Sequence, residues 1–134
     1  VSRDFTCVEP WKALQIKGCV EHENSQYISV CNRIDLMRFD YDKFFKDGKQ
    51  NVRDIWNHPI IQHMRKTVNS NELNPICRLC KSKEYGMIRC LDNERYRQLR
   101  DAAANEFLCE FHDKYGAQLP HYTGVTVLTE TPHA

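Results

Sequence analysis

Cysteine is the feature of this sequence that most constrains its fold. The chain has seven cysteines in 134 residues, and two of them form the pair Cys77-Arg78-Leu79-Cys80. An odd number of cysteines argues against a disulfide-bonded extracellular framework, in which even numbers are usual. A CxxC pair in a chain without a visible signal peptide is instead typical of ligands to a metal ion or an iron–sulfur cluster. We therefore expect a metal centre to replace part of the hydrophobic core.

The size and charge of the chain exclude several other classes of protein. A chain of 134 residues has room for one small domain, or for one domain and a tail. The formal net charge is +1, and Lys and Arg are spread along the sequence, which argues against nucleic acid as a partner. No apolar run approaches the roughly 20 residues that span a bilayer, and the first residues contain no signal-peptide segment. We expect a cytoplasmic protein without membrane contact.

Two segments near the start of the chain have the patterns of β-strands. Apolar and polar residues alternate over 11–16, and β-branched and aromatic residues are concentrated over 27–31. A polar connection over 17–26 joins them, so the sequence predicts a β-hairpin with an enlarged tip. A further strand is predicted at 125–128.

Helical spacing of apolar residues follows the hairpin. The pattern from Val52 to Val68 predicts two helices separated at Pro59, which belongs in the first turn of the second helix. A longer helix is predicted over 92–115, ended by Gly116, and the cysteine pair is predicted to lie in a loop over 74–90. The expected fold class is α+β: a small β-hairpin with two or three helices around a metal-cluster centre.

Four cysteines are the candidate ligands of this centre. Cys7 precedes the first predicted strand and Cys31 closes the second, so a hairpin can bring these two near each other. A following helix can then return Cys77 and Cys80 to complete the set. Four thiolates suit a [4Fe–4S] cluster or a zinc ion, and the spacing alone does not separate these two. A redox dithiol is disfavoured, because the strand–helix context usual for one is missing.

The order of several short motifs resembles the SPASM/twitch family of iron–sulfur cluster-binding domains, over roughly residues 5 to 95. The segments that carry the resemblance are Cys7-Val8-Glu9-Pro10-Trp11, Leu14-x-Ile16, Tyr27-Ile28-Ser29-Val30-Cys31, Asn51-Val52-Arg53-Asp54-Ile55-Trp56-Asn57 with Arg65, Pro75-x-Cys77-x-x-Cys80, Glu84-x-Gly86 and Arg89-x-x-x-Asn93. One departure is Gln26, which stands where the family hairpin usually has a Gly. Aligning Gly18 with that Gly instead would promote Cys19 to a ligand.

The resemblance implies a function as an auxiliary cluster domain. It implies a [4Fe–4S] cofactor held by Cys7, Cys31, Cys77 and Cys80, and a radical-SAM catalytic domain or protein as the partner, with a peptide or small molecule as its substrate. The CxxxCxxC motif of radical-SAM enzymes is absent from the sequence, so we expect a fragment or accessory of such an enzyme with no catalysis of its own. Electron relay and substrate positioning both remain open as its role.

The resemblance also implies a division of the chain. Residues 1–95 are expected to form the cluster-binding domain, 96–116 a C-terminal helix that packs on it, and 117–134 a tail or the start of a following domain. Ligation couples to folding in small metal-binding domains, so a metal-free chain is expected to be much less stable. The alternative function is a structural zinc-binding protein-interaction module that uses the same four cysteines.

The remaining candidate residues have simpler interpretations. Cys109 is expected to be a small core residue on a helix face, and Cys90 a spare thiol. His58 and His63 are expected at the surface or as helix caps. Trp11 and Trp56 are expected in the core. Arg65 and Arg89 are expected in surface salt bridges or as hydrogen-bond donors to cluster sulfides.

Overall fold

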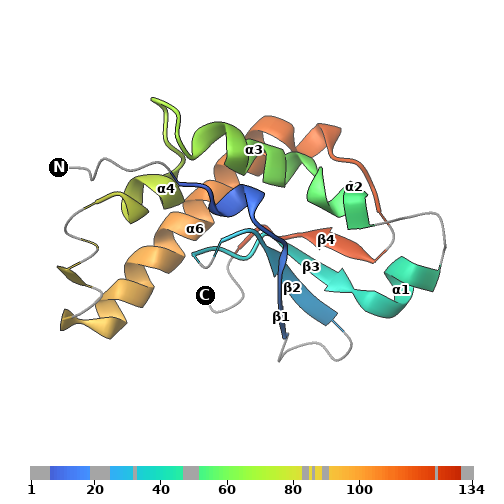
Figure 1. Ribbon diagram of the computed structural model, residues 1–134, viewed down its shortest axis with the longest axis horizontal. Helices are drawn as coiled ribbons and strands as arrows, with labels where there is room; N and C mark the ends of the chain where they lie inside the picture. Colours follow the sequence, from blue (N-terminus) through green and yellow to red (C-terminus); the bar gives the residue numbers. More distant parts are fainter. Residues whose placement is uncertain are drawn as a thin grey trace.

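The protein has an α+β fold in which helices pack on one side of a four-stranded antiparallel sheet (Figure 1). The computed structural model describes residues 7–18, 25–31, 33–46, 52–82, 85, 87–88, 91–122 and 124–130. Its described elements are, in chain order, η1 (Glu9–Trp11), β1 (Gln15–Gly18), β2 (Ser25–Ser29), β3 (Met37–Asp40), α1 (Tyr41–Lys46), α2 (Val52–Trp56), α3 (Pro59–Thr67), α4 (Pro75–Cys80), α6 (Asn93–Tyr115), η2 (Gly116–Gln118) and β4 (Val125–Val127). The α+β class predicted from the sequence is confirmed.

The predicted hairpin exists, but its first strand begins later than expected. β1 pairs with β2 in antiparallel register, with Ile16 opposite Ile28. The segment 9–11, which includes part of the first predicted strand, forms the 3₁₀ helix η1 instead. Pro10 explains the difference, because its fixed φ and missing N–H suit the first turn of a helix.

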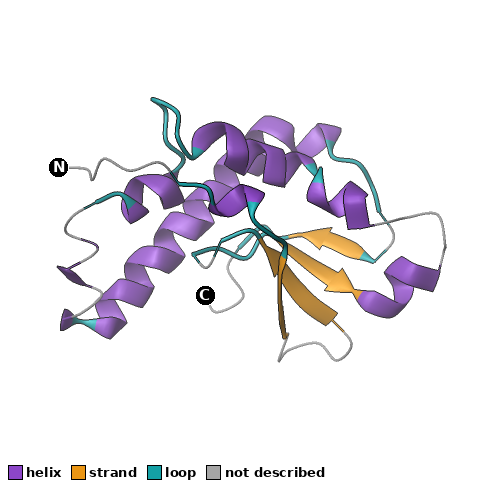
Figure 2. Cartoon of the chain, in the orientation of Figure 1, coloured by secondary structure: helices purple, strands orange, loops and turns teal. Residues whose placement is uncertain are grey.

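Two further strands extend the hairpin into a sheet, which is coloured orange in Figure 2. β3 pairs with β2 and β4 pairs with β3, so the strand order is β1-β2-β3-β4. The sequence did not predict β3. This strand has only four residues, in which buried Met37 and Phe39 alternate with partly exposed neighbours. The strand predicted at 125–128 is confirmed as β4, and it belongs to the same sheet as the hairpin.

Gly124 allows β4 to approach the rest of the sheet. Its φ is +82°, and its carbonyl oxygen accepts a hydrogen bond of 2.7 Å from the backbone N–H of Asp40. A Cβ atom at this position would lie 2.7 Å from the backbone nitrogen of Phe44 and 2.8 Å from the carbonyl oxygen of Asp40. Only glycine fits this contact without strain.

We expect Gly124→Ala to destabilise the fold by about 2–3 kcal/mol, because the new side chain meets backbone atoms and the φ is unfavourable for alanine. Thermal unfolding followed by circular dichroism measures the change. Gly18→Ala is the matched control: no atom lies within 4 Å of the position that its Cβ would take. An equal loss of stability in both variants would contradict the role assigned to Gly124.

The two helices predicted around Pro59 are confirmed as α2 and α3. His58 caps α3: its Nδ1 accepts a hydrogen bond of 3.1 Å from the backbone N–H of Ile60. The expectation of a helix cap is confirmed for His58, but the alternative of a surface position is wrong, since its side chain is only 1% exposed. Burial lowers the pKa of His58 from 6.5 to about 4, because the protonated ring loses its hydration.

Because His58 is buried in its neutral form, we expect the free energy of unfolding to fall in acid. The folded-state pKa of His58 lies below its unfolded value, so its contribution is complete above about pH 6.5 and is lost as the pH falls toward 4. The full effect amounts to about 3 kcal/mol. We expect His58→Asn, which keeps a cap acceptor but cannot titrate, to lose this part of the pH dependence in urea unfolding between pH 7 and pH 4. Parallel pH profiles for the two proteins would contradict the prediction.

The sheet, α3 and α6 enclose one hydrophobic core. α6 matches the long helix predicted before Gly116 and is capped by Asp92, whose side chain accepts a hydrogen bond from the backbone N–H of Arg95. The buried residues of this core are Ile28, Val30, Ile34, Leu36, Met37, Phe39, Phe44, Ile55, Ile60, Ile61, Met64, Val68, Ile76, Cys77, Ala104, Phe107, Leu108 and Phe111. Trp11 was expected in this core, but its side chain is 48% exposed, because η1 lies at the surface. Within the described ranges, no helix has the length and apolar character needed to cross a bilayer.

Candidate metal centre

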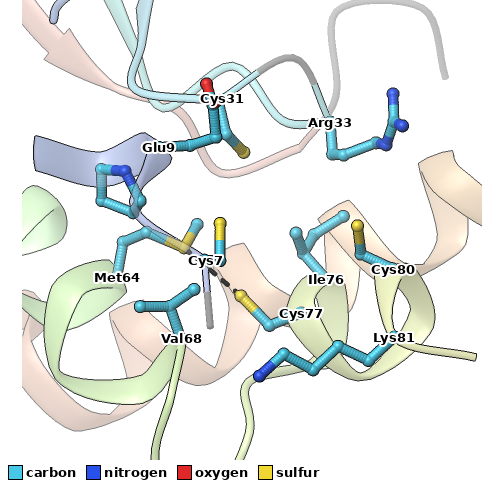
Figure 3. Close-up of a pocket in the computed structure, with 11 residues that line it drawn as sticks. Cys7, Glu9, Cys31, Arg33, Met64, Val68, Ile76, Cys77, Cys80 and Lys81 are labelled. Carbon is cyan, nitrogen blue, oxygen red and sulfur yellow. Dashed lines mark hydrogen bonds between the residues drawn. The ribbon is translucent and has the colours of Figure 1, made fainter. Parts of the chain in front are cut away.

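All four predicted ligand cysteines line a single cavity of about 270 Å³ (Figure 3). Cys7 comes from the segment before η1, Cys31 from the turn after β2, and Cys77 and Cys80 from α4. The other lining residues are Glu9, Pro10, Arg33, Met64, Val68, Ile76 and Lys81. Three segments that are far apart in sequence therefore bring their thiols to one cavity, as the candidate ligand set requires.

Cys7 is held in place by contacts to the region of α3. Its backbone N–H donates to Oδ1 of Asn69 at 3.0 Å, and Nδ2 of Asn69 donates to its carbonyl oxygen at 2.9 Å. Nε of Arg65 donates to the carbonyl oxygen of Pro10 at 3.0 Å, and its guanidinium lies 4.2 Å from the centre of the Trp56 ring. The expectation of a surface salt bridge for Arg65 is therefore wrong, because its guanidinium fastens η1 to the helices.

Cys31 is positioned by a turn built around Ser29. The Ser29 side chain is fully buried, and its hydroxyl contacts the carbonyl oxygens of Cys31 and Ile34. The same oxygen accepts a hydrogen bond of 3.1 Å from the backbone N–H of Cys31. These contacts end β2 at Ser29, two residues earlier than predicted, and leave Cys31 in an isolated bridge with Ile34. The turn thereby directs Cys31 toward the cavity.

The cysteine pair lies on a helix, where the sequence predicted a loop. Asn74 caps α4 by accepting from the backbone N–H of Cys77 at 2.9 Å, and Pro75 occupies the first helical turn. Cys77 and Cys80 are three residues apart, so a helical turn places both side chains on the same face. The cap followed by proline is a recognisable helix start, and this signal was missed.

The Asn74 amide also contacts the sulfur of Cys77 directly. Its Nδ2 donates to Sγ of Cys77 at 3.2 Å and to Oγ1 of Thr67 at 2.8 Å. On another side, Sδ of Met64 lies 3.9 Å from the same Sγ. Asn74 therefore fixes both the backbone and the side chain of this cysteine, as residues around a metal ligand commonly do.

Burial keeps two of the four thiols in their neutral form. It raises the pKa of Cys77 to about 12, although the Asn74 hydrogen bond opposes the change and the other three cysteines add to it. Burial also raises the pKa of Cys31, and its electrostatic interactions with Cys80 and Cys7 act in the same direction. The four sulfurs are thus close enough to influence one another. A cation in the cavity would reverse this preference, because it stabilises thiolates.

A positively charged residue that the sequence analysis missed lies at the same cavity. Arg33 follows Cys31 in the turn, and its guanidinium lies 5.9 Å from the centre of the Tyr96 ring. Burial alone would lower the pKa of Arg33, but Tyr96, Tyr85 and Cys80 outweigh burial, so the pKa is raised and the side chain stays charged. No motif marks an arginine in a turn as part of a site, so only the structure reveals it.

Of the three remaining cysteines, Cys109 is the one that the described residues include, and it does not line the cavity. Cys19 and Cys90, with Arg89, lie outside the described residues. Cys109 was expected in the core, but this is wrong: it is exposed on α6, with its Sγ 3.8 Å from Oδ2 of Asp113. The core face of α6 around it is occupied by larger residues, Phe107 and Leu108 among them.

The geometry of the cavity can be compared with that of known metal centres. Among the described residues, no group of three or more His, Cys, Asp or Glu is arranged so that it could hold one metal ion. A tetrahedral zinc site with Zn–S bonds of about 2.3 Å requires sulfurs only about 3.8 Å apart. Iron–sulfur clusters also take cysteine thiolates, but they occupy a volume of their own between the ligands. A cavity of this volume that is lined by four cysteines, with Arg33 and Lys81 as cationic neighbours, fits such a cluster in donor type and in space.

The chain was compared with known proteins, and no protein-family model, curated protein or solved structure matches it. The resemblance to SPASM/twitch domains therefore rests on the motifs alone. The interpretation of the cavity rests on its own residues.

Proposed function

We propose that this chain is an auxiliary iron–sulfur domain that holds a [4Fe–4S] cluster on Cys7, Cys31, Cys77 and Cys80. The observation that carries the proposal is the convergence of these four thiols, from three separate segments, on one cavity of about 270 Å³. The sequence pattern alone marks these four cysteines as a ligand set, and their convergence on one cavity supports that assignment. A radical-SAM domain or protein as the partner is supported by the motif resemblance only.

The size of the cavity favours a cluster over zinc. A cavity needs only about 10–15 Å³ to hold a water molecule, so this one has room for much more than one ion. With zinc, the four cysteines would have to close around one ion and fill the cavity themselves.

The chain itself supplies ligation, orientation and shielding. Asn74 and Ser29 orient Cys77 and Cys31, while Met64, Val68 and Ile76 form an apolar wall that limits contact with water. When bound, a four-cysteine cluster supplies one-electron transfer, and a cluster with an open iron would instead bind a substrate group. Because four cysteines are present at the cavity, we favour electron relay over substrate binding.

The test is a metal analysis of the protein purified without oxygen. We expect a brown protein with broad visible absorption and about four irons and four sulfides per chain. Zinc is measured on the same sample. A colourless protein that holds one zinc, and that takes up no cluster on reconstitution with iron and sulfide, would replace this proposal with the structural zinc module.

A further inference from the structure

Arg33 has a buried donor that no described group satisfies. Its Nε is inaccessible to solvent and has no hydrogen-bond partner among the residues that the structure describes. Buried polar groups in folded proteins almost always have partners, so an unsatisfied one requires an explanation. Arg33 lines the cavity that also holds the four cysteines, and Figure 3 places its side chain on the same side as Cys80. A ligand in the cavity is one explanation for the missing partner.

The surroundings of Arg33 restrict where its guanidinium can go. The backbone on both sides is fixed by the bridge between Cys31 and Ile34. The guanidinium lies against the ring of Tyr96, which stacks on Tyr85 with 4.9 Å between ring centres and 16° between ring planes. Aromatic rings and a fixed turn hold a cation in place better than an exposed surface does. Arg33 is therefore preorganised at the cavity and is not a freely moving surface side chain.

Other cations near the cavity are engaged differently. Arg65 also has a buried donor without a partner among the described residues, its Nη2, but its Nε donates to the carbonyl oxygen of Pro10 and its guanidinium lies on Trp56, and it is not among the residues that line the cavity. Lys81 also lines the cavity, but a lysine carries no donor comparable to a buried Nε. Arg33 is the residue that combines a fixed charge, an unsatisfied donor and a place beside Cys80.

We propose that Arg33 is a tuning residue: it donates from Nε to a sulfur of the bound centre and makes that centre easier to reduce. The inference rests on the proposed function. A cluster with four thiolates is an anion, and uptake of one electron adds a further negative charge. A cation held beside it stabilises the reduced state more than the oxidised state, and a hydrogen bond to sulfur acts in the same direction.

The experiment is a redox titration of the cluster-loaded protein without oxygen. Dithionite is the electron donor, and visible absorption measures the fraction of reduced centre. We expect Arg33→Gln to keep its iron and sulfide but to lower the ratio of reduced to oxidised centre about tenfold at a fixed potential. That change corresponds to a midpoint lower by about 59 mV for a one-electron couple. Arg33→Lys keeps the charge without Nε and should fall between Arg33→Gln and the parent protein. Arg97→Gln, on the exposed face of α6, is the control and should titrate like the parent.

The outcomes separate this inference from the function on which it rests. Fully loaded Arg33→Gln and Arg33→Lys proteins that both titrate like the parent would overturn the role of Arg33 and leave the cluster domain intact. If the Arg33→Gln protein does not take up the cluster, the midpoint potential of the Arg33→Lys protein tests the inference. A lowered midpoint supports the inference, and an unchanged midpoint overturns it. A parent protein that takes up no iron overturns both proposals. Loss of packing alone would change cluster content without shifting the midpoint of the loaded fraction.

Discussion

Replacing Cys77 by Ser is expected to abolish the metal centre. Cys77 is the most deeply buried of the four candidate ligands and is fixed by Asn74 on both its backbone and its side chain. A serine hydroxyl has nearly the same size but does not form the soft, anionic ligand that iron–sulfur clusters require. We expect iron and sulfide content to fall from about four each to below about one per chain, with loss of the visible absorption. Cys80→Ser, on the same face of α4, should behave in the same way.

Cys109→Ser is the matched control for this experiment. Cys109 is exposed on α6, away from the cavity residues, so its replacement should leave iron, sulfide and absorption at the level of the parent protein. Full metal retention in Cys77→Ser or Cys80→Ser would show that the ligand assignment is wrong. Loss of the centre in Cys109→Ser would show that a ligand was overlooked.

Removing the centre should destabilise the whole domain strongly. The four cysteines come from the segment before η1, the turn after β2 and the helix α4, so a bound centre would link three segments that are far apart in the sequence. A ligand bound about a thousandfold above its Kd stabilises a fold by about 4 kcal/mol. For a domain of this size, that corresponds to a fall in Tm of about 15 °C in the metal-free protein.

Calorimetry of loaded and metal-free protein measures this difference, and hydrogen exchange locates it. We expect protection to be lost first in α4 and η1, while β2 and β3, which pair directly with each other, keep theirs. The metal-free parent and the Cys77→Ser variant should have the same Tm, because both lack the centre. Equal Tm values for loaded and metal-free protein would contradict a structural contribution from the centre.

Much of the helical part of this fold could be predicted from the sequence. Pro59 and Gly116 mark a helix start and a helix end, and the three-and-four spacing between Val52 and Val68 identifies a buried face. These signals are local, so they do not depend on distant partners. α2, α3 and α6 occur accordingly within a few residues of their predicted positions.

The errors lie where distant contacts decide the local structure. Ser29 ends β2 because its hydroxyl contacts Cys31 and Ile34, and no periodic pattern shows such a contact. β3 is too short for its alternation to be distinctive, and it is stabilised by strands on both sides. Trp11 is apolar enough for a core, but Pro10 starts a surface turn that leaves it half exposed.

The four cysteines of the candidate site could be picked out from the sequence, whereas the residues around them could not. Cys7, Cys31, Cys77 and Cys80 stood out by residue type and order, and all four line the cavity. The hydrogen bonds of the Asn74 amide to Cys77 and Thr67 and the charge of Arg33 at the cavity make no repeating pattern in the sequence. Their contributions depend on the three-dimensional turn in which each lies, so they emerge only from the structure.

The pairing of β4 with β3 affects the order of events while the chain is being synthesised. All four cavity cysteines leave the ribosome before residues 125–127, so every candidate ligand is present while β3 still lacks its second neighbour. An unpaired strand edge is open to wrong partners until its proper one arrives. Delivery of iron and sulfur to the nascent chain can therefore precede closure of the sheet. Under the proposed function, a cluster received early would hold η1 and α4 together during the interval in which β3 still lacks β4.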